Sequence, residues 1–190
     1  MRSVFDSRRS SAVSLGSNQT STLLTRYAAV AATAAIVDGL TKFLVVRAFG
    51  VGGGLTLSQR LSIFVTFNEG SAGGVMVGPY TWHLNVLLTA VALVLITAIV
   101  RQLATVDSRA AIALGLVAGG AIGNMCSMIW GPPGVADFFA IQITPDSTMI
   151  MNVADLELWS GSLLLLPVVV RLVRAIRAER RPRSAALASR

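Results

Sequence analysis

Four long apolar runs constrain this chain more than any other feature of its sequence. They extend over about Tyr27 to Val46, Trp82 to Val100, Ala110 to Met128 and Met149 to Val170. Each is close to the ~20 residues that a helix needs to cross ~30 Å of hydrocarbon. Because lipid cannot hydrogen-bond the backbone, these runs must be helices unless the chain forms a closed barrel, and no series of barrel strands is present. The sequence therefore predicts an all-α integral membrane protein with four transmembrane helices.

The composition supports a membrane protein and argues against a soluble domain. Charged residues make up 13% of the 190 residues, whereas a soluble domain usually has about 25%. The net charge of +7 does not indicate nucleic-acid binding, because the basic residues cluster at the two ends and in one short loop, without a basic groove interleaved with aromatics. The single cysteine, Cys126, lies in an apolar run without metal-ligand spacing, so no disulfide, metal or organic cofactor is expected.

The distribution of basic residues predicts the orientation of the chain. Thirteen of the 16 Lys and Arg residues lie before the first run, between the second and third, or after the fourth. By the positive-inside rule both termini are cytoplasmic, and the two longer loops, about residues 47–81 and 129–148, face outward. Residues 1–22 are expected to form a disordered cytoplasmic tail, residues 23–172 the membrane domain, and residues 173–190 a basic cytoplasmic tail that contacts anionic lipids.

The first outer loop has a pattern of its own. Its segment Leu61–Asn68 is rich in β-branched and aromatic residues and lies between two glycine clusters, at residues 52–54 and 70–74. Such a segment favours a strand over a disordered loop. We therefore expect a small β-sheet in this first extracytoplasmic loop, lying on the outer surface.

Two charged residues of the first run form a natural pair. Charged side chains at membrane depth cost ~2.5–3.5 kcal/mol each on insertion scales, so those that remain need a physical reason. Asp38 and Lys42 are four residues apart and therefore share one helix face. A structural ion pair that also caps the outer end of the helix is favoured over direct participation in chemistry.

Two aspartates can reach the same depth near the outer interface. Asp137 lies in the second outer loop, and Asp155 lies about a turn into the fourth helix, roughly 6 Å along its axis. Two carboxylates that share a site do not both ionise easily, so one can take a proton from water while the other polarises a carbonyl. This arrangement suits peptide hydrolysis without a covalent intermediate. Two alternatives stay open: a capping Asp155 beside an unrelated solvated Asp137, and a proton relay or ion pathway.

Three asparagines flank these carboxylates. Asn68 ends the expected strand, Asn124 lies near the outer end of the third span, and Asn152 precedes Asp155 by one turn. Amides are costly in lipid unless they are hydrogen-bonded, so their convergence suggests a polar pocket. Ordinary hydrogen bonding between helices is the alternative.

Five short motifs, taken together, resemble those of the lipoprotein signal peptidase (signal peptidase II) family. In the order and spacing of that family occur Asp38-Gly-Leu-Thr-Lys42, Asn68-Glu-Gly-Ser-Ala72, Gly119-Gly-Ala-Ile-Gly-Asn124, Gly134-Val-Ala-Asp-Phe138 and Asn152-Val-Ala-Asp155. The resemblance covers about Ala35 to Val170. Any one of these motifs is weakly specific, whereas five in register on a four-span scaffold are strongly so.

The resemblance implies a bacterial inner-membrane aspartyl peptidase with its active site near the outer face. Such an enzyme removes signal peptides from prolipoproteins by cutting before the diacylglyceryl-modified cysteine. The resemblance makes Asp137 and Asp155 the catalytic pair, and makes the expected sheet the cradle that holds substrate. Asp38 and Lys42 would hold the first helix in place, and the pocket residues would be Asn68, Gly70, Asn124, Asn152 and Ala154. The implied partners are prolipoprotein signal peptides and membrane lipids, and a monomer is expected.

The chain also departs from the family pattern. Ser127 and Met128 stand where the family has an Asp-Arg pair, and Gly73 and Met151 replace two usual phenylalanines. Trp130-Gly-Pro-Pro133 makes the second outer loop unusual. The lost arginine would have supported the loop and favoured an ionised carboxylate nearby. An active divergent enzyme is the favoured interpretation; the alternatives are an inactive or altered homologue that binds lipopeptides, and a small transporter or proton relay.

Overall fold

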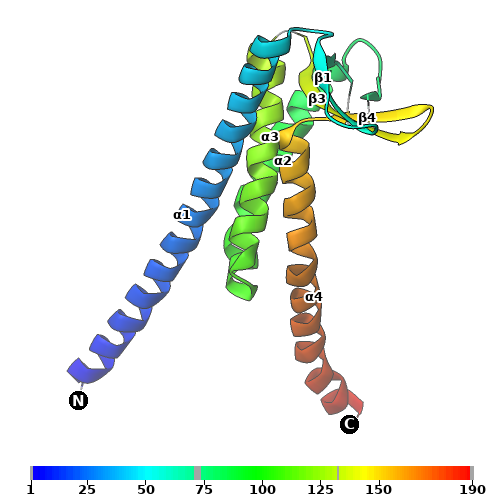
Figure 1. Ribbon diagram of the computed structural model, residues 1–190. Helices are drawn as coiled ribbons and strands as arrows, with labels where there is room; N and C mark the ends of the chain where they lie inside the picture. Colours follow the sequence, from blue (N-terminus) through cyan, green and yellow to red (C-terminus); the bar gives the residue numbers. More distant parts are fainter. Residues whose placement is uncertain (1, 71–73, 132, 189–190) are drawn as a thin grey trace.

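The computed structural model describes the backbone of residues 2–70, 74–131 and 133–188, and the side chains of residues 21–70, 74–131 and 133–178. Within these ranges the chain forms a bundle of helices with one β-sheet at one end (Figure 1). Both chain ends lie at the opposite end of the bundle from the sheet. The helices are α1 (Arg2–Phe49), α2 (Thr81–Val106), α3 (Arg109–Trp130) and α4 (Val153–Ala188).

Four of the described helical segments are long and apolar enough to cross a membrane. These segments are Ser21–Phe49, Thr81–Val106, Arg109–Trp130 and Val153–Ala178. Each overlaps one of the apolar runs of the sequence, so the prediction of four transmembrane helices is confirmed. The chain is a multi-pass membrane protein.

At both ends of the chain a helix continues into the segment expected to be a tail. α1 extends back to Arg2, so the backbone is helical over most of the segment expected to be disordered, and α4 extends forward to Ala188. Adding a residue to an existing helix is much easier than nucleating one, and no proline interrupts residues 2–49. The division into a central domain with two tails stays a prediction, and Met1, Ser189 and Arg190 lie outside the described residues.

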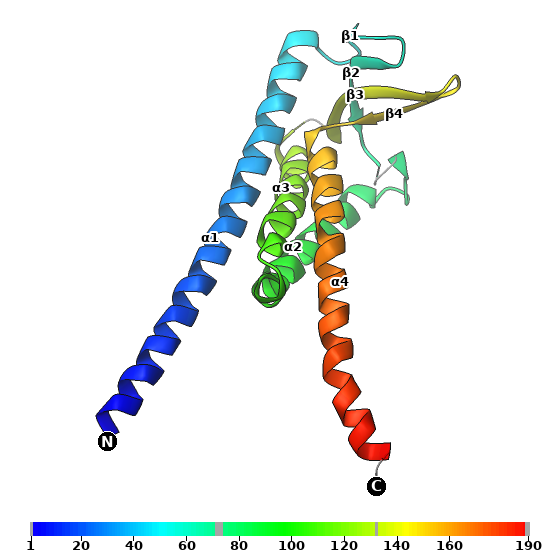
Figure 2. The ribbon, with the colours of Figure 1, turned by 60° about the horizontal axis from the view of Figure 1, so that its bottom comes forward.

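The sheet combines both outer loops. Its strands are β1 (Gly54–Thr56), β2 (Leu61–Asn68), β3 (Val135–Thr144) and β4 (Ser147–Met151), in that order and antiparallel throughout. Figure 2 shows it lying across the end of the bundle. The first loop was expected to contain the whole sheet, but half of it comes from the second.

The start of the fourth helix was also placed too early in the sequence. Met149 and Met151 pair with Ile141 and Phe139 of β3, so the helix begins only at Val153. The strand β3 supplies backbone partners that the isolated apolar run does not reveal. The segment between residues 149 and 151 therefore satisfies its backbone in the sheet.

Glycines let α3 pack closely against two neighbours. A Cβ atom on Gly119 would clash with Ala34 of α1, and one on Gly120 would lie 2.6 Å from the carbonyl oxygen of Ala154 in α4. Small residues that admit close backbone approach are typical of helix contacts in membranes. α3 is therefore the central helix, in contact with the face of α1 on one side and the first turn of α4 on the other.

Polar contacts between side chains also join the elements at the opposite end of the bundle. The Tyr27 hydroxyl lies 3.0 Å from Thr97 Oγ1 and connects α1 to α2. Arg171 Nη1 of α4 lies 2.8 Å from Oδ2 of the buried Asp107, in the turn between α2 and α3. Nothing in the sequence pattern indicated this second pair, because the residues are far apart along the chain.

Candidate active site

The first turn of α4 carries a reciprocal pair of hydrogen bonds between Asn152 and Asp155. Asn152 Oδ1 accepts the backbone N–H of Asp155 at 3.1 Å, and Asp155 Oδ2 accepts the backbone N–H of Asn152 at 3.0 Å. This is a capping box, in which the residue before a helix and its third residue satisfy each other's N–H groups. It holds the Asp155 carboxylate at the helix N-terminus, where the helix dipole favours negative charge.

Asp137 reaches the same asparagine from the sheet. It lies in β3 opposite Thr66 of β2, and its Oδ1 accepts a 2.6 Å hydrogen bond from Asn152 Nδ2. Asn152 Oδ1 is already the acceptor for Asp155 N–H, so its NH₂ group must face Asp137. Asn152 is fully buried and Asp137 is only 5% exposed. The buried side-chain amide of Asn152 thus hydrogen-bonds both the carboxylate of Asp137 and the backbone N–H of Asp155.

Asn124 of α3 adds a second amide to this network. Its Nδ2 donates to Asp155 Oδ1 at 3.3 Å, and its Oδ1 accepts from Lys42 Nζ at 2.7 Å. A lysine ammonium can only donate, so Lys42 fixes which end of the Asn124 amide faces Asp155. Asn152 Nδ2 also lies 3.2 Å from Asn124 Oδ1, which connects the two amides directly.

Asp38 joins this network to the helix framework. Its Oδ2 lies 2.7 Å from Lys42 Nζ, and its Oδ1 accepts the backbone N–H of Ala154 at 2.9 Å. The ion pair agrees with the spacing of the two residues, but the carboxylate caps α4 rather than the end of its own helix. A Cβ on Gly123 would clash with this carboxylate, so the glycine is needed for α3 to pass so close.

Burial changes the acidity of Asp137. Removal from water raises its pKa from 3.8 to about 6; the hydrogen bond from Asn152 opposes this rise, and the negative charge of Asp155 adds to it. Lys42 and Asn68 oppose it by smaller amounts. A carboxyl group with a pKa near 6 can hold or release a proton close to neutral pH, as general acid–base chemistry requires.

Asn68 interacts with Asp137 and also bonds the loop that follows β2. It ends β2 opposite Val135, and its Oδ1 accepts the backbone N–H of Gly70 at 3.0 Å. The Gly70 carbonyl accepts from Asn85 Nδ2 of α2 at 3.3 Å. The hydrogen bonds of Asn68 therefore shape the loop after β2, while Asn124 and Asn152 bond each other. The sequence analysis missed Asn85, although an amide inside an apolar run was a visible signal. Ser71, Ala72 and Gly73 lie outside the described residues.

A protein-family model described as signal peptidase (SPase) II matches residues 30–171 of the chain. That segment is most of the chain and contains every residue of the network. The chain belongs to the signal peptidase II family. It is 34% identical over 138 residues to the lipoprotein signal peptidase of Geobacillus kaustophilus (strain HTA426), covering 72% of this chain and 87% of that protein. It is 36% identical over 148 residues to the lipoprotein signal peptidase of Mycolicibacterium smegmatis (strain ATCC 700084 / mc(2)155), covering 72% of this chain and 57% of that protein.

Two solved structures of a bacterial membrane enzyme share the fold of this signal peptidase II family member. The structure at 2.3 Å resolution has a TM-score of 0.67 and 23% identity, covering 76% of this chain and 87% of its own. The structure at 1.9 Å resolution has a TM-score of 0.66 and 23% identity, covering 75% of this chain and 91% of its own. At this identity the likeness concerns the fold, which combines spanning helices with a small sheet.

Two of the positions that depart from the family pattern, Ser127 and Met128, lie in the last turn of α3. The backbone oxygen of Ser127 accepts the N–H of Gly131 at 3.0 Å, and that of Met128 accepts the indole N–H of Trp82 at 2.9 Å. These contacts use backbone atoms and secure the end of α3 without an arginine. Among the side chains that the structure describes, the cation bonded to the aspartate network is Lys42.

Proposed function

We propose that this chain is an intramembrane aspartic endopeptidase that removes signal peptides from diacylglyceryl-modified prolipoproteins, cutting before the lipidated cysteine. Its family membership supports the substrate class. The aspartic mechanism is supported by one observation above all: Asn152 donates to Asp137 with its amide and to Asp155 with its backbone. Lys and Arg placement supports a site near the outer face of the bacterial inner membrane, with both termini cytoplasmic.

The surroundings of the two carboxylates support different roles. Asp155 accepts two hydrogen bonds, from Asn152 N–H and Asn124 Nδ2, at the N-terminus of a helix. We assign Asp155, whose two carboxylate oxygens these hydrogen bonds hold in place, as the general base. Asp137 is buried in β3 with a pKa raised to about 6, so it holds the proton that polarises the substrate carbonyl.

The reaction then proceeds in two steps that conserve protons. In the first, Asp155 takes a proton from water, the hydroxyl attacks the scissile carbonyl carbon, and Asp137 transfers its proton to the carbonyl oxygen. In the second, Asp155 gives its proton to the amide nitrogen, the C–N bond breaks, and one hydroxyl of the intermediate returns its proton to Asp137. The products are a signal peptide with a free carboxyl group and a lipoprotein that begins with the modified cysteine.

The remaining residues of the pocket position these groups. Asn124 and Asn152 orient the carboxylates, while Asn68 and Gly70 shape the loop beside β3. Ala154 presents its backbone N–H to Asp38, and Lys42 completes that pair. Loss of any of these contacts should reduce turnover by misplacing the carboxylates, since small errors of position are costly in catalysis.

Cleavage of a purified diacylglyceryl-modified prolipoprotein by the reconstituted full-length protein tests this function. Wild-type protein should release the signal peptide, which shifts the substrate on a gel, and Asp137→Asn and Asp155→Asn should each abolish that shift. Asp146→Asn is the matched control, because Asp146 is exposed in the turn between β3 and β4 and should leave cleavage unchanged. An unlipidated precursor should stay uncut.

A non-catalytic homologue that binds lipopeptides is the second candidate, favoured by Ser127 and Met128 in place of the family's Asp-Arg pair. It predicts binding of the lipidated precursor by wild-type protein without any product, and equal binding by both asparagine variants. Absence of cleavage with several lipidated precursors, together with retained binding, would replace the enzyme by this candidate.

A further inference from the structure

Asn85 connects α2 to the loop that follows β2. It lies in the second turn of a helix that begins at Thr81, and its Nδ2 donates to the carbonyl oxygen of Gly70 at 3.3 Å. An amide in a spanning helix is costly unless it is hydrogen-bonded, so its presence there needs a physical reason. None of the five sequence motifs includes this residue. Its role therefore has to be inferred from its contacts.

Asn68 lies on the same face of the sheet as Asp137. Thr66 of β2 pairs with Asp137 of β3, and cross-strand partners share a face. Asn68 is two residues beyond Thr66, so its side chain projects from that face too. Its Oδ1 accepts the backbone N–H of Gly70 at 3.0 Å, which leaves its NH₂ group to interact with Asp137.

Gly70 links the two asparagines. Its N–H bonds Asn68, and its carbonyl oxygen bonds Asn85. A Cβ atom on Gly70 would lie 2.5 Å from the carbonyl carbon of Gly74, so a larger residue does not fit there. Glycine has more backbone freedom than any other residue, so contacts from outside must fix its conformation. The amide of Asn85 supplies such a contact.

The first turns of α2 are themselves held in place. Trp82 Nε1 donates to the backbone oxygen of Met128, at the end of α3, at 2.9 Å. The hydroxyl of the buried Thr81 accepts the N–H of Val77 at 2.8 Å, which secures the end of the loop that enters the helix. Because this part of α2 is attached to α3, Asn85 is a fixed point from which the loop can be held.

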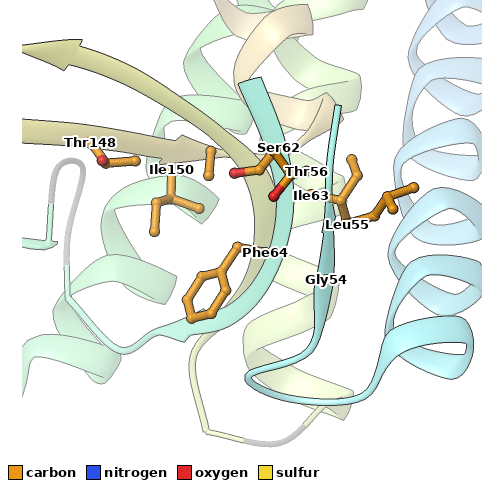
Figure 3. Close-up of a pocket in the computed structure, with 9 residues that line it drawn as sticks. Gly54, Leu55, Thr56, Ser62, Ile63, Phe64, Thr148 and Ile150 are labelled. Carbon is orange, nitrogen blue, oxygen red and sulfur yellow. The ribbon is translucent and has the colours of Figure 1, made fainter. Parts of the chain in front are cut away.

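The groove on the sheet lies apart from these contacts. It has a volume of about 430 Å³ and is lined by residues of all four strands, among them Phe64 of β2 and Ile150 of β4 (Figure 3). Its lining on β2 consists of residues 62–64 and does not reach Asn68. A change at Asn85 should therefore leave the walls of the groove intact and affect the reaction through Asp137.

We propose that Asn85 is a positioning residue of the active site: it holds the backbone of Gly70, which in turn holds the amide of Asn68 against Asp137. The effect on cleavage rests on the proposed function, whereas the series of contacts does not. α2 then takes part in the active site without contributing a residue to the network of the two aspartates.

The acidity of Asp137 responds to groups from three other elements. Asn68 of β2 and Lys42 of α1 lower its pKa, and Asp155 of α4 raises it. A hydrogen bond to a carboxylate favours its charged form, so loss of the Asn68 contact should raise the pKa of Asp137 further. Lys42 and Asp155 are both bonded by a side chain of α3, so a change at Asn85 should leave them in place.

Asn85→Leu tests the proposal in the full-length protein reconstituted in phospholipid vesicles. The pH dependence of kcat/KM for cleavage of a diacylglyceryl-modified prolipoprotein reports ionisation in the free enzyme. The fall in kcat/KM expected past about pH 6 should move to higher pH, by up to about one unit for one lost hydrogen bond. Thr97→Val is the matched control, because it removes a bond from α2 to Tyr27 at the opposite end of the bundle and should leave the profile unchanged.

A double substitution identifies the route of the effect. If Asn85 acts through Asn68, Asn85→Leu should cause no further shift in a protein that already carries Asn68→Ala. A shift of the same size in both backgrounds would overturn the proposed route. A decrease of kcat/KM by the same factor at every pH would show a merely structural role. Thermal unfolding checks that each variant is folded, and Asn85→Ala replaces Asn85→Leu if that variant is not.

The pH dependence of unfolding separates this proposal from the proposed function. The contribution of Asp137 to stability is lost as pH rises through its folded pKa, and this loss is measured without turnover. In Asn85→Leu the loss should extend to higher pH than in Thr97→Val. If the wild type cleaves nothing but this difference is present, the peptidase is rejected and the positioning role stands. An unfolding profile that is the same in both variants would reject the positioning role itself.

Discussion

The Asp137→Asn substitution should raise the stability of the protein at pH 8 while abolishing its peptidase activity. The substitution removes a carboxyl group that is only 5% exposed and keeps an oxygen that can accept the hydrogen bond from Asn152. The ordinary pKa of 3.8 applies to the unfolded chain, whereas burial raises the folded value to about 6. The folded protein therefore binds more protons than the unfolded chain between about pH 4 and pH 6. The contribution of Asp137 to stability should be largest below this window and should be lost as pH rises through it.

The size of this stability difference follows from the shift in the pKa of Asp137. A change of about two pKa units at 1.36 kcal/mol per unit corresponds to about 3 kcal/mol. At pH 8 the Asp137→Asn variant should therefore be more stable than the wild type by up to about 3 kcal/mol, and at pH 4 this advantage should disappear. Unfolding followed by tryptophan fluorescence in detergent micelles, at both pH values, measures the difference. The same variant is expected to have no peptidase activity.

Two control variants make this result specific. Asp155→Asn removes one acceptor oxygen of the capping box and should destabilise the protein by about 1 kcal/mol at pH 8. Asp146→Asn, in the exposed turn, should leave the free energy of unfolding unchanged at both pH values. A difference between wild type and Asp137→Asn that is the same at pH 4 and pH 8 would refute the claim that burial of this carboxyl sets its acidity.

Three further predictions test the network and its packing. Lys42→Met leaves its buried partner carboxylate unpaired and should cost about 3–5 kcal/mol of stability in the same unfolding assay. Gly120→Ala places a Cβ against the Ala154 carbonyl and should cost about 1–3 kcal/mol, whereas Gly39→Ala, with open space at its Cβ, should be neutral or stabilising. If Asp137 is the proton donor, kcat/KM should fall as pH rises past about 6, and a flat profile between pH 5 and pH 8 would contradict this role.

The spanning helices were the most predictable part of the fold. Residues 110–128 and 82–100, for example, lie within Arg109–Trp130 and Thr81–Val106. Each such helix satisfies its own backbone hydrogen bonds, so its existence depends on local composition alone. The strands β3 and β4 were not foreseen, because short apolar runs cannot be assigned to strand or helix by pattern alone. β3 pairs with β2, so that Asp137 lies opposite Thr66, 71 residues earlier in the chain, and β4 pairs with β3.

The candidate site was predictable as a set of residues but not as a set of contacts. The motifs named Asp38, Lys42, Asn124 and Asn152 together with Asp137 and Asp155, and the structure joins these six by hydrogen bonds. The contact between the Asp38 carboxylate and the Ala154 backbone was not foreseen. Spacing along one helix indicates pairs four residues apart, and it carries no information on residues in different helices.

The sequence by itself determined that the chain crosses a membrane four times, and its motifs indicated the family, because both depend on residues close together in the chain. Only the tertiary structure decided that Asn152 bonds both aspartates and that Lys42 orients the Asn124 amide. The same holds for the raised pKa of Asp137. These properties arise from burial and hydrogen bonding among α1, α3, α4 and β3, and distances through space between separate elements are not encoded in any local pattern.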